Sequence, residues 1–128
     1  MERVTGLGGI FWRARDPAAL GRWYAECLGV APPPGEADRP WWADAGPVVF
    51  APFSADTDYF AGPQQAWMPN FRVRDLDAML AQLRAMGAEV EDRVEDYDYG
   101  RFGWVRDPEG NRVELWEPSG DQLDAPEP

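Results

Sequence analysis

Few residues of this chain could perform chemistry, because its 128 residues include no histidine and only one cysteine, Cys27. Catalysis by a Ser–His or Cys–His pair is therefore excluded, and so is a metal site built from imidazole ligands. Cys27 falls in the apolar stripe of a predicted helix, which indicates a buried and unreactive thiol. No glycine-rich phosphate loop is present either. The candidates that remain are carboxylates, arginines and aromatic side chains.

Glu114 is the carboxylate with the strongest case for a function. It lies in an alternating segment in which Val113 and Leu115 point to one face and Glu114 to the other. The same alternation in an earlier segment turns Arg72 toward the face of Glu114. In a partly apolar cleft Glu114 would suit general acid or base catalysis. The alternative is a structural ion pair between Glu114 and Arg72, since either charge buried alone would be costly.

Basic and aromatic side chains extend this candidate site. An internal repeat relates Arg13 to Arg72, so both are expected on one face, where they could hold an anionic or carbonyl group. Alternatively, one arginine balances Glu114 and the other lies in solvent. Four of the seven tryptophans could form a wall that stacks a planar ligand, with core filling as the alternative: Trp41, Trp42, Trp104 and Trp116. The predicted ligand-binding residues are Phe11, Arg13, Trp42, Phe50, Asn70, Arg72, Trp104, Glu114 and Trp116.

Two copies of one strand–helix–strand unit are predicted to position these residues. Residues 12–16 (WRARD) and 71–75 (FRVRD) stand 59 positions apart, and each segment leads into an apolar helical stripe. Asp16 and Asp75 suit the two N-caps, and Gly29 and Gly87 suit the two C-terminal ends.

Strand-like stretches follow each helix, which predicts the order β-α-β-β-β twice. In the first unit they lie around Val30, at 41–43 and at 47–53, and in the second at 88–97, 101–106 and 111–116. We therefore expect an α+β fold with a single domain over 1–118, built of units 4–55 and 66–118, and a frayed polar tail over 119–128. Residues 32–35 predict a stiff loop and 107–111 a tight turn rather than a catalytic cluster. The acidic run 91–98 predicts a solvated edge rather than a calcium loop.

Charge and composition limit the possible partners. Twelve basic residues against 23 acidic ones give a net charge of −11, which disfavours nucleic acid and anionic membranes. Such a charge attracts a cationic ligand or a basic protein, although solubility alone is the simpler interpretation. No apolar run is long enough to span a membrane, no secretory signal is recognised, and a lone cysteine suits a reducing compartment. A cytoplasmic location is the expectation.

Three segments resemble the vicinal-oxygen-chelate superfamily, which includes glyoxalase I, bleomycin-resistance proteins and extradiol dioxygenases. They are 9–30 (GIFWRARDPAALGRWYAECLGV), 70–90 (NFRVRDLDAMLAQLRAMGAEV) and 105–118 (VRDPEGNRVELWEP). The resemblance covers about residues 4–118. It implies two βαβββ modules whose sheets curl around a shared cleft, often completed by a second subunit, and hence a homodimer.

The resemblance also implies four metal-ligand positions, and this chain departs from the pattern at three of them. The positions fall at Gly9, at Met68, at Val48 or Val49, and at Glu114. Only Glu114 can bind a hard or borderline cation, and even catalytic zinc needs about three protein ligands. We therefore expect no metal, no cofactor, and neither glyoxalase nor dioxygenase chemistry of the metal-dependent kind.

Binding of a small organic molecule is the function that these observations favour. The ligand is expected to be planar or aromatic and to lie in a tryptophan-lined acidic cleft. The resemblance to the drug-sequestering branch of the superfamily implies binding without turnover by a homodimer. The first alternative is a metal-independent lyase, isomerase or hydrolase that uses Glu114 with Arg72 or Arg13. The second is a regulatory or structural module that has lost its cleft chemistry.

Overall fold

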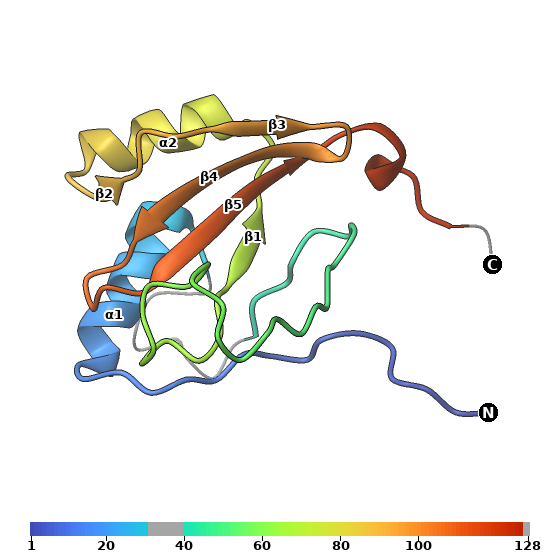
Figure 1. Cartoon of the computed structure of the whole chain (residues 1–128), viewed down its shortest axis with the longest axis horizontal. Coiled ribbons are helices and arrows are strands. Elements are labelled where there is room, and N and C mark those ends of the chain that lie inside the picture. The colour runs from blue at the N-terminus through green and yellow to red at the C-terminus, as the bar shows by residue number, and fades with distance from the viewer. Residues whose placement is uncertain (31–39, 127–128) are drawn as a thin grey trace.

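The computed structural model describes residues 1–30 and 40–126, and Figure 1 shows their arrangement. Within these residues, two α-helices and a five-stranded sheet are the main regular elements, which confirms the predicted α+β class. The helices are α1 (Pro17–Trp23), continued by a π-helical turn (Tyr24–Leu28), and α2 (Leu76–Ala85). The strands are β1 (Asn70–Arg72), β2 (Glu89–Val90), β3 (Glu95–Tyr97), β4 (Gly100–Arg106) and β5 (Arg112–Pro118).

Both helices begin and end at the predicted residues because their caps are local interactions. The Asp16 carboxylate accepts a hydrogen bond from the Ala19 amide at 3.1 Å, and the Asp75 carboxylate accepts one from the Ala78 amide at 3.0 Å. Each bond satisfies an amide that has no partner inside its helix. At the C-terminal end of the first helical segment, Gly29 has φ 71°, the left-handed conformation that glycine adopts without strain.

The strands of the described residues all belong to the second unit, whereas both units were expected to contribute a sheet. Its strands lie in the order β1-β5-β4-β2, and β3 also pairs with β4. β1 runs parallel to β5, and the remaining pairs are antiparallel. The predicted strand 88–97 is divided into β2 and β3, which pair with different parts of β4. This second unit therefore has the expected βαβββ order with one strand interrupted.

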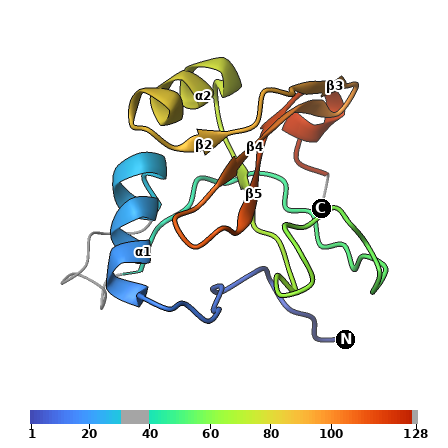
Figure 2. The same cartoon turned by 60° about the vertical axis from the view of Figure 1, so that its left-hand side comes forward.

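The helices cover one face of the sheet, and this face holds the apolar core (Figure 2). Val105, Val113 and Leu115 point from the sheet into the core, as their alternation predicts. The helical contributors are Leu20, Tyr24, Cys27, Leu76, Leu80 and Leu83. At Gly103 a Cβ atom would stand 3.2 Å from the methyl groups of Leu80, so glycine allows α2 to pack close to the strand. Cys27 is buried as expected, and burial raises the pKa of its thiol.

The prediction of strands in the first unit is wrong. The described residues 1–30 and 40–69 contain no strand, although the segments 41–43 and 47–53 have strand-like composition. A strand requires a hydrogen-bonded neighbour, and these segments contact the sheet through side chains instead. Arg72 of β1, for example, donates to the carbonyl oxygens of Pro47 and Asp44 at 2.6 and 2.5 Å. The predicted loop 32–35 lies outside the described residues.

The two ends of the chain behave differently. Residues 1–11 run away from the body in Figure 1, with exposed apolar side chains at Val4 and Leu7. Gly120–Leu123 forms a turn of 3-10 helix where a frayed tail was predicted, and Ser119 attaches this turn to the β3–β4 hairpin through the Asp98 carbonyl. Among the described residues, no helix has the length and apolar character needed to span a bilayer.

Candidate functional site

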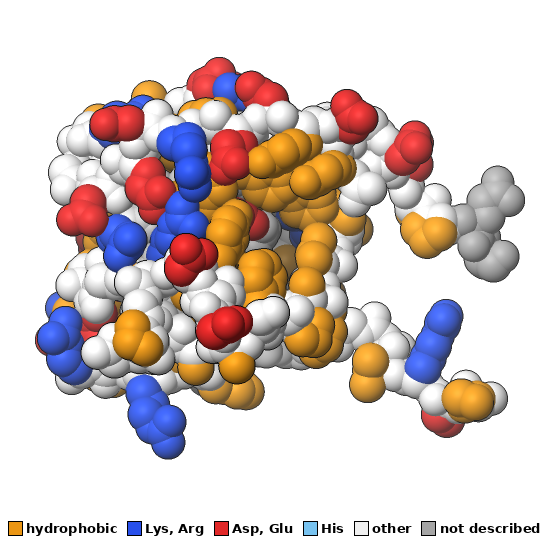
Figure 3. All heavy atoms as spheres, in the orientation of Figure 1, with side chains coloured by type: hydrophobic (Ala, Val, Ile, Leu, Met, Phe, Trp, Pro, Cys, Tyr) orange, Lys and Arg blue, Asp and Glu red, His pale blue; other side chains and the backbone are white. Residues whose placement is uncertain are grey.

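The sheet face opposite the helices carries the candidate site. Strand register places two side-chain pairs from β4 and β5 there, Trp104 opposite Glu114 and Phe102 opposite Trp116. β1 adds Asn70 beside Glu114 and Arg72 beside Trp116. We call this surface, with Arg112, the open face. The space-filling view shows hydrophobic side chains around a hollow in front of the sheet (Figure 3).

Glu114 is held by neutral donors at the centre of the open face. The Asn70 amide donates to Oε1 at 2.6 Å, the Trp104 indole donates to Oε2 at 3.0 Å, and the Tyr59 hydroxyl donates to the same oxygen through a short hydrogen bond. Only 8% of Glu114 is exposed. The predicted ion pair between Glu114 and Arg72 is wrong, because Arg72 donates to two backbone carbonyls instead. The carboxylate is thus satisfied without a direct ionic partner.

Tyr59 is a site residue that sequence reasoning missed. It lies in the segment that joins the two units, for which no periodicity predicts a contact with the sheet. Its ring stacks on Phe53 with centroids 5.6 Å apart and meets the edge of Trp104 at 6.4 Å. Burial, together with the hydrogen bond to Glu114, raises the pKa of Tyr59 far above its usual value. The phenol therefore stays protonated near neutral pH and acts as a donor to the carboxylate.

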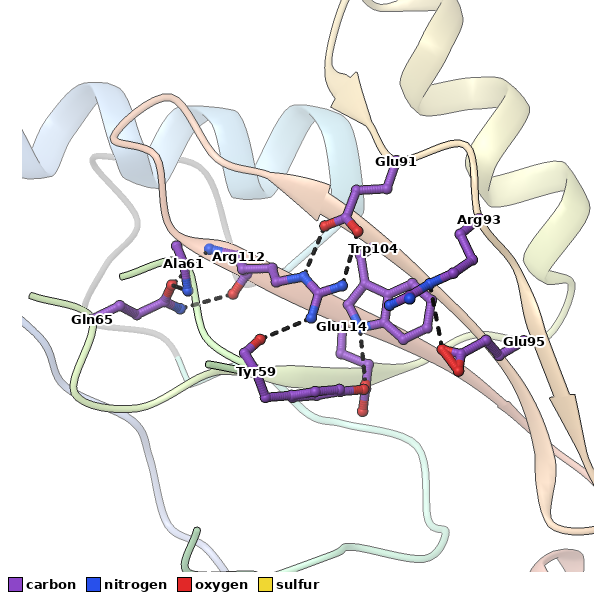
Figure 4. A network of polar contacts seen from close by, with 9 residues as sticks. All are labelled: Tyr59, Ala61, Gln65, Glu91, Arg93, Glu95, Trp104, Arg112 and Glu114. Carbon is purple, nitrogen blue, oxygen red and sulfur yellow. Dashed lines mark hydrogen bonds and ion pairs between the residues drawn. The ribbon is translucent and has the colours of Figure 1, made fainter. Parts of the chain in front are cut away.

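Arg112 closes the other side of the site (Figure 4). Its Nε and Nη2 atoms donate to the two carboxylate oxygens of Glu91, both at 2.8 Å, and Nη1 donates to the Tyr59 carbonyl. The Arg112 hydrogen bonds lower the pKa of Glu91. The guanidinium also lies over the Trp104 ring at 4.8 Å, and Arg93 lies over the same ring at 4.9 Å. The alternation of residues along β5 predicts the sheet face on which Arg112 lies, but it does not predict its contacts with Glu91, Tyr59 and Trp104.

Trp104 and Trp116 lie on the predicted face but have almost no exposed surface. Trp104 is 1% exposed, with Tyr59 and the two guanidinium groups around its ring. Trp116 stacks on Phe102 at 6.0 Å with a 5° angle between the rings, and its Nε1 donates to the Tyr99 carbonyl. The prediction that Trp104 and Trp116 offer free ring faces to a ligand is therefore wrong. These rings support the open face from within.

Four of the predicted ligand-binding residues are exposed and do not contact Glu114. They are Phe11, Arg13, Trp42 and Phe50. Among the described residues, neither a hydrogen bond nor a ring contact joins them to the open face. Arg13 is exposed, as the alternative expected of one arginine, but the other half of that alternative is wrong because Arg72 does not balance Glu114. Of the predicted set, Asn70, Arg72, Trp104, Glu114 and Trp116 are gathered on one face.

The segment 107–111 is a turn, as predicted. Asp107 accepts hydrogen bonds from the amides of Glu109 and Asn111, and Gly110 has φ 85°. The Tyr24 hydroxyl donates to the same carboxylate at 2.8 Å. Asp107 is therefore a structural acceptor that ties the first helical segment to the β4–β5 turn.

The donor set does not fit a metal ion. Among residues 1–30 and 40–126, no group of three or more His, Cys, Asp or Glu side chains is close enough to share one. Around Glu114 the neighbours are an amide, a phenol and an indole, all of them donors to the carboxylate. The amide and indole nitrogens have no free lone pair for a cation, so Glu114 and the Tyr59 oxygen remain, fewer than the about three protein ligands of catalytic zinc.

Comparison with known proteins identifies the family. Residues 9–116 match the family model described as a glyoxalase-like domain. A search of curated proteins found no match. Among solved structures, TnmS3, an antibiotic binding protein from Streptomyces sp. CB03234, is similar at 24% identity with a TM-score of 0.49, over 81% of this chain and 88% of that one. TioX from Micromonospora sp. ML1 is similar at 26% identity with a TM-score of 0.37, over 41% of this chain and 43% of TioX.

The present chain thus matches less than half of the length of TioX, and the match to TnmS3 spans most of both chains. The family match, by contrast, extends from Gly9 to Trp116 within β5, and it includes both helices. The chain therefore belongs to the glyoxalase-like domain family.

Proposed function

We propose that this protein binds a small planar or aromatic organic molecule on its open face, without a metal ion. The observation that carries the proposal is the apolar hollow in front of the sheet (Figure 3), on the face to which the buried, hydrogen-bonded Glu114 carboxylate belongs. Binding sites for small molecules are typically concave and mostly apolar, with a few fixed polar groups that orient the ligand. Glu114 and Arg112 are such groups, each held by several partners.

The hydrogen bonds of Glu114 support a role in binding more than a role in catalysis. A general base needs a free lone pair aimed at the substrate, and Glu114 already accepts three hydrogen bonds from Asn70, Tyr59 and Trp104. A ligand that contacts this preorganised carboxylate gains orientation without any rearrangement of the protein. Binding without turnover is therefore the simpler use of the arrangement.

The proposal includes a homodimer in which a second copy covers the exposed apolar parts of the first. Residues 1–11 expose Val4, Leu7 and Ile10, and Val48 and Val49 of the first unit are exposed as well. Exposed apolar surface commonly marks an interaction site where such side chains lie together.

A titration with a planar neutral probe tests the binding proposal. Quinoline at mildly alkaline pH is expected to give saturable binding by calorimetry and to be recovered unchanged. Phe102→Leu removes a ring from the open face and should weaken binding. Phe71→Leu is the matched control, because Phe71 lies on the helix-facing side of the sheet. Absence of saturable binding at millimolar concentration, or equal weakening by both variants, would contradict the proposal.

A further inference from the structure

We propose that the hairpin joining β3 and β4 is a subsite for the positive charge of the ligand, so that the ligand is a planar organic cation. This inference rests on the proposed function and names the ligand class for the same face. Its basis is a cluster of aromatic rings, which we call the hairpin cluster: Tyr97, Tyr99, Phe102 and Trp116.

The rings of the hairpin cluster are held in fixed positions. Tyr97 and Tyr99 stack with centroids 5.2 Å apart and an angle of 3° between the rings, and Phe102 meets both at 5.8 to 5.9 Å. Gly100 has φ 144°, and a Cβ atom there would stand 2.4 Å from the Trp116 indole nitrogen. Only glycine therefore lets Trp116 donate to the Tyr99 carbonyl at 3.1 Å, the bond that fixes the hairpin over the sheet.

The outer two rings are open to solvent. Tyr97 is 47% exposed and Tyr99 is 49% exposed, whereas Trp116 beneath them is 2% exposed. Figure 3 shows this hydrophobic patch over the β3–β4 end of the sheet, with acidic side chains on either side of it. A cluster that served only to stabilise the hairpin would be expected to bury these rings. The exposed ring faces form a platform that continues the open face outward.

The charges around the platform favour a cation. The Tyr97 hydroxyl donates to Glu95 at 2.7 Å, which places a carboxylate beside the aromatic pair. Asp98 lies between the two tyrosines in sequence, and Ser119 attaches the C-terminal turn, with its Asp121, to the Asp98 carbonyl. Aromatic faces attract cations through their quadrupole, and neighbouring carboxylates strengthen that attraction.

The basic residues of the hairpin are engaged elsewhere. Arg101 points to the helix side, where it pairs with Asp77 at 3.1 Å and with Asp96 at 2.8 Å. Arg93 lies over Trp104 and 3.5 Å from Glu95, so it balances one carboxylate without lying on the tyrosine platform. Aromatic faces, exposure and acidic charge therefore coincide at one end of the open face.

Two isosteric probes separate this inference from the proposed function. N-methylquinolinium carries a permanent charge, and quinoline of nearly the same shape is neutral at mildly alkaline pH. Calorimetric titration of the full chain at low salt should show tighter binding of the cation, by roughly two- to fivefold for one exposed cation–π contact. High salt should reduce that preference.

Variants test whether the hairpin cluster provides the preference. Tyr99→Leu removes one ring face and should bring the two affinities together, whereas Tyr99→Phe keeps the ring and should keep most of the preference. Asp98→Asn should also reduce it, while Glu26→Gln, the same change of net charge at an exposed position of the π-helical turn, should not. Thermal unfolding confirms that each variant is folded.

The outcomes are distinguishable. Equal affinity for both probes, or a cation preference that Tyr99→Leu leaves intact, overturns the cation subsite but leaves the proposed function standing. If neither probe binds, the proposed function fails and this inference fails with it.

Discussion

Glu114 accepts hydrogen bonds from three neutral side chains, and this geometry allows a test at the level of one atom. In Glu114→Gln an NH₂ group replaces one acceptor oxygen, so it must face at least one of the three donors. We expect a loss of about 1.5–3 kcal/mol in the free energy of unfolding, the range for hydrogen bonds to a charged group. Urea denaturation measures it.

Glu89→Gln is the control for that substitution, because Glu89 is exposed on β2. Its effect should stay within about 0.5 kcal/mol, as for most surface changes. Equal effects of the two substitutions would show that the hydrogen bonds to Glu114 do not stabilise the fold.

Two tyrosines give the protein a predictable response to alkali. Burial and the neighbouring carboxylates Asp107 and Glu114 raise the pKa values of Tyr24 and Tyr59, respectively. A raised pKa of the folded state stabilises the fold fully below the unfolded value of about 10, and this stabilisation is lost as pH rises above it. Tyrosinate absorbance should therefore show two residues that ionise only when the chain unfolds. In Tyr59→Phe only one such residue should remain, and independent ionisation of both in the native state would contradict the assignment.

At the scale of elements, the two N-cap residues Asp16 and Asp75 allow the same substitution to be compared in both helices. Asp16→Ala and Asp75→Ala each remove one side-chain acceptor from a helix N-terminus. Each substitution should cost about 1 kcal/mol of stability, measured by urea unfolding followed by circular dichroism. Asp92→Ala at an exposed position outside any strand or helix is the control and should be nearly neutral. A neutral result at Asp16 would indicate that α1 contributes little to the cooperative fold.

The same elements show why parts of the fold were predictable from the sequence. Helix limits depend on neighbours within a few residues, such as Asp75 and its bond to the Ala78 amide, and were predicted correctly. The alternation of Val113 and Leu115 with Glu114 and Trp116 identified the two faces of β5. The first-unit strands were not predictable in this way, because a strand forms only where a distant segment provides a partner, and composition does not supply one.

The candidate site was predictable only in part for a related reason. Alternation placed Asn70, Trp104 and Glu114 on one face, but it says nothing about a loop that folds across that face. Tyr59 reaches Glu114 from 55 positions away, and Glu91 reaches Arg112 from 21. The sequence also suggested Arg72 as the partner of Glu114, because the two have opposite charges and alternation places them on the same face. Nothing in the sequence indicated that three neutral side chains would donate to Glu114 instead. The exposed rings of Tyr97 and Tyr99 likewise depend on the geometry of the hairpin.

At the scale of the whole molecule, the donor set predicts indifference to metal ions. Because Gly9, Met68 and Val48 or Val49 stand at three of the ligand positions that the resemblance implies, added Zn²⁺, Ni²⁺, Mn²⁺ or Fe²⁺ should leave the melting temperature unchanged. An ion present at a hundredfold over its dissociation constant would stabilise the native state by about 2.7 kcal/mol. A stabilisation of that size, abolished by Glu114→Gln, would contradict the assignment of Glu114 to a metal-free site.

The apolar surface of the first unit predicts the oligomeric state. Residues 1–11 extend away from the body (Figure 1), and within residues 1–30 and 40–126 β1 is an edge strand whose one partner is β5. Exposed apolar segments and open sheet edges favour association with another copy. Light scattering at micromolar concentration should therefore return about twice the chain mass of 14.4 kDa. A double substitution of Val4 and Leu7 by Glu should shift this mass toward the monomer, whereas Leu123→Glu, at an exposed position of the C-terminal turn, should not. A monomeric mass for the unmodified chain would rule out the homodimer, and a dimer insensitive to the double substitution would place the interface away from the N-terminal segment.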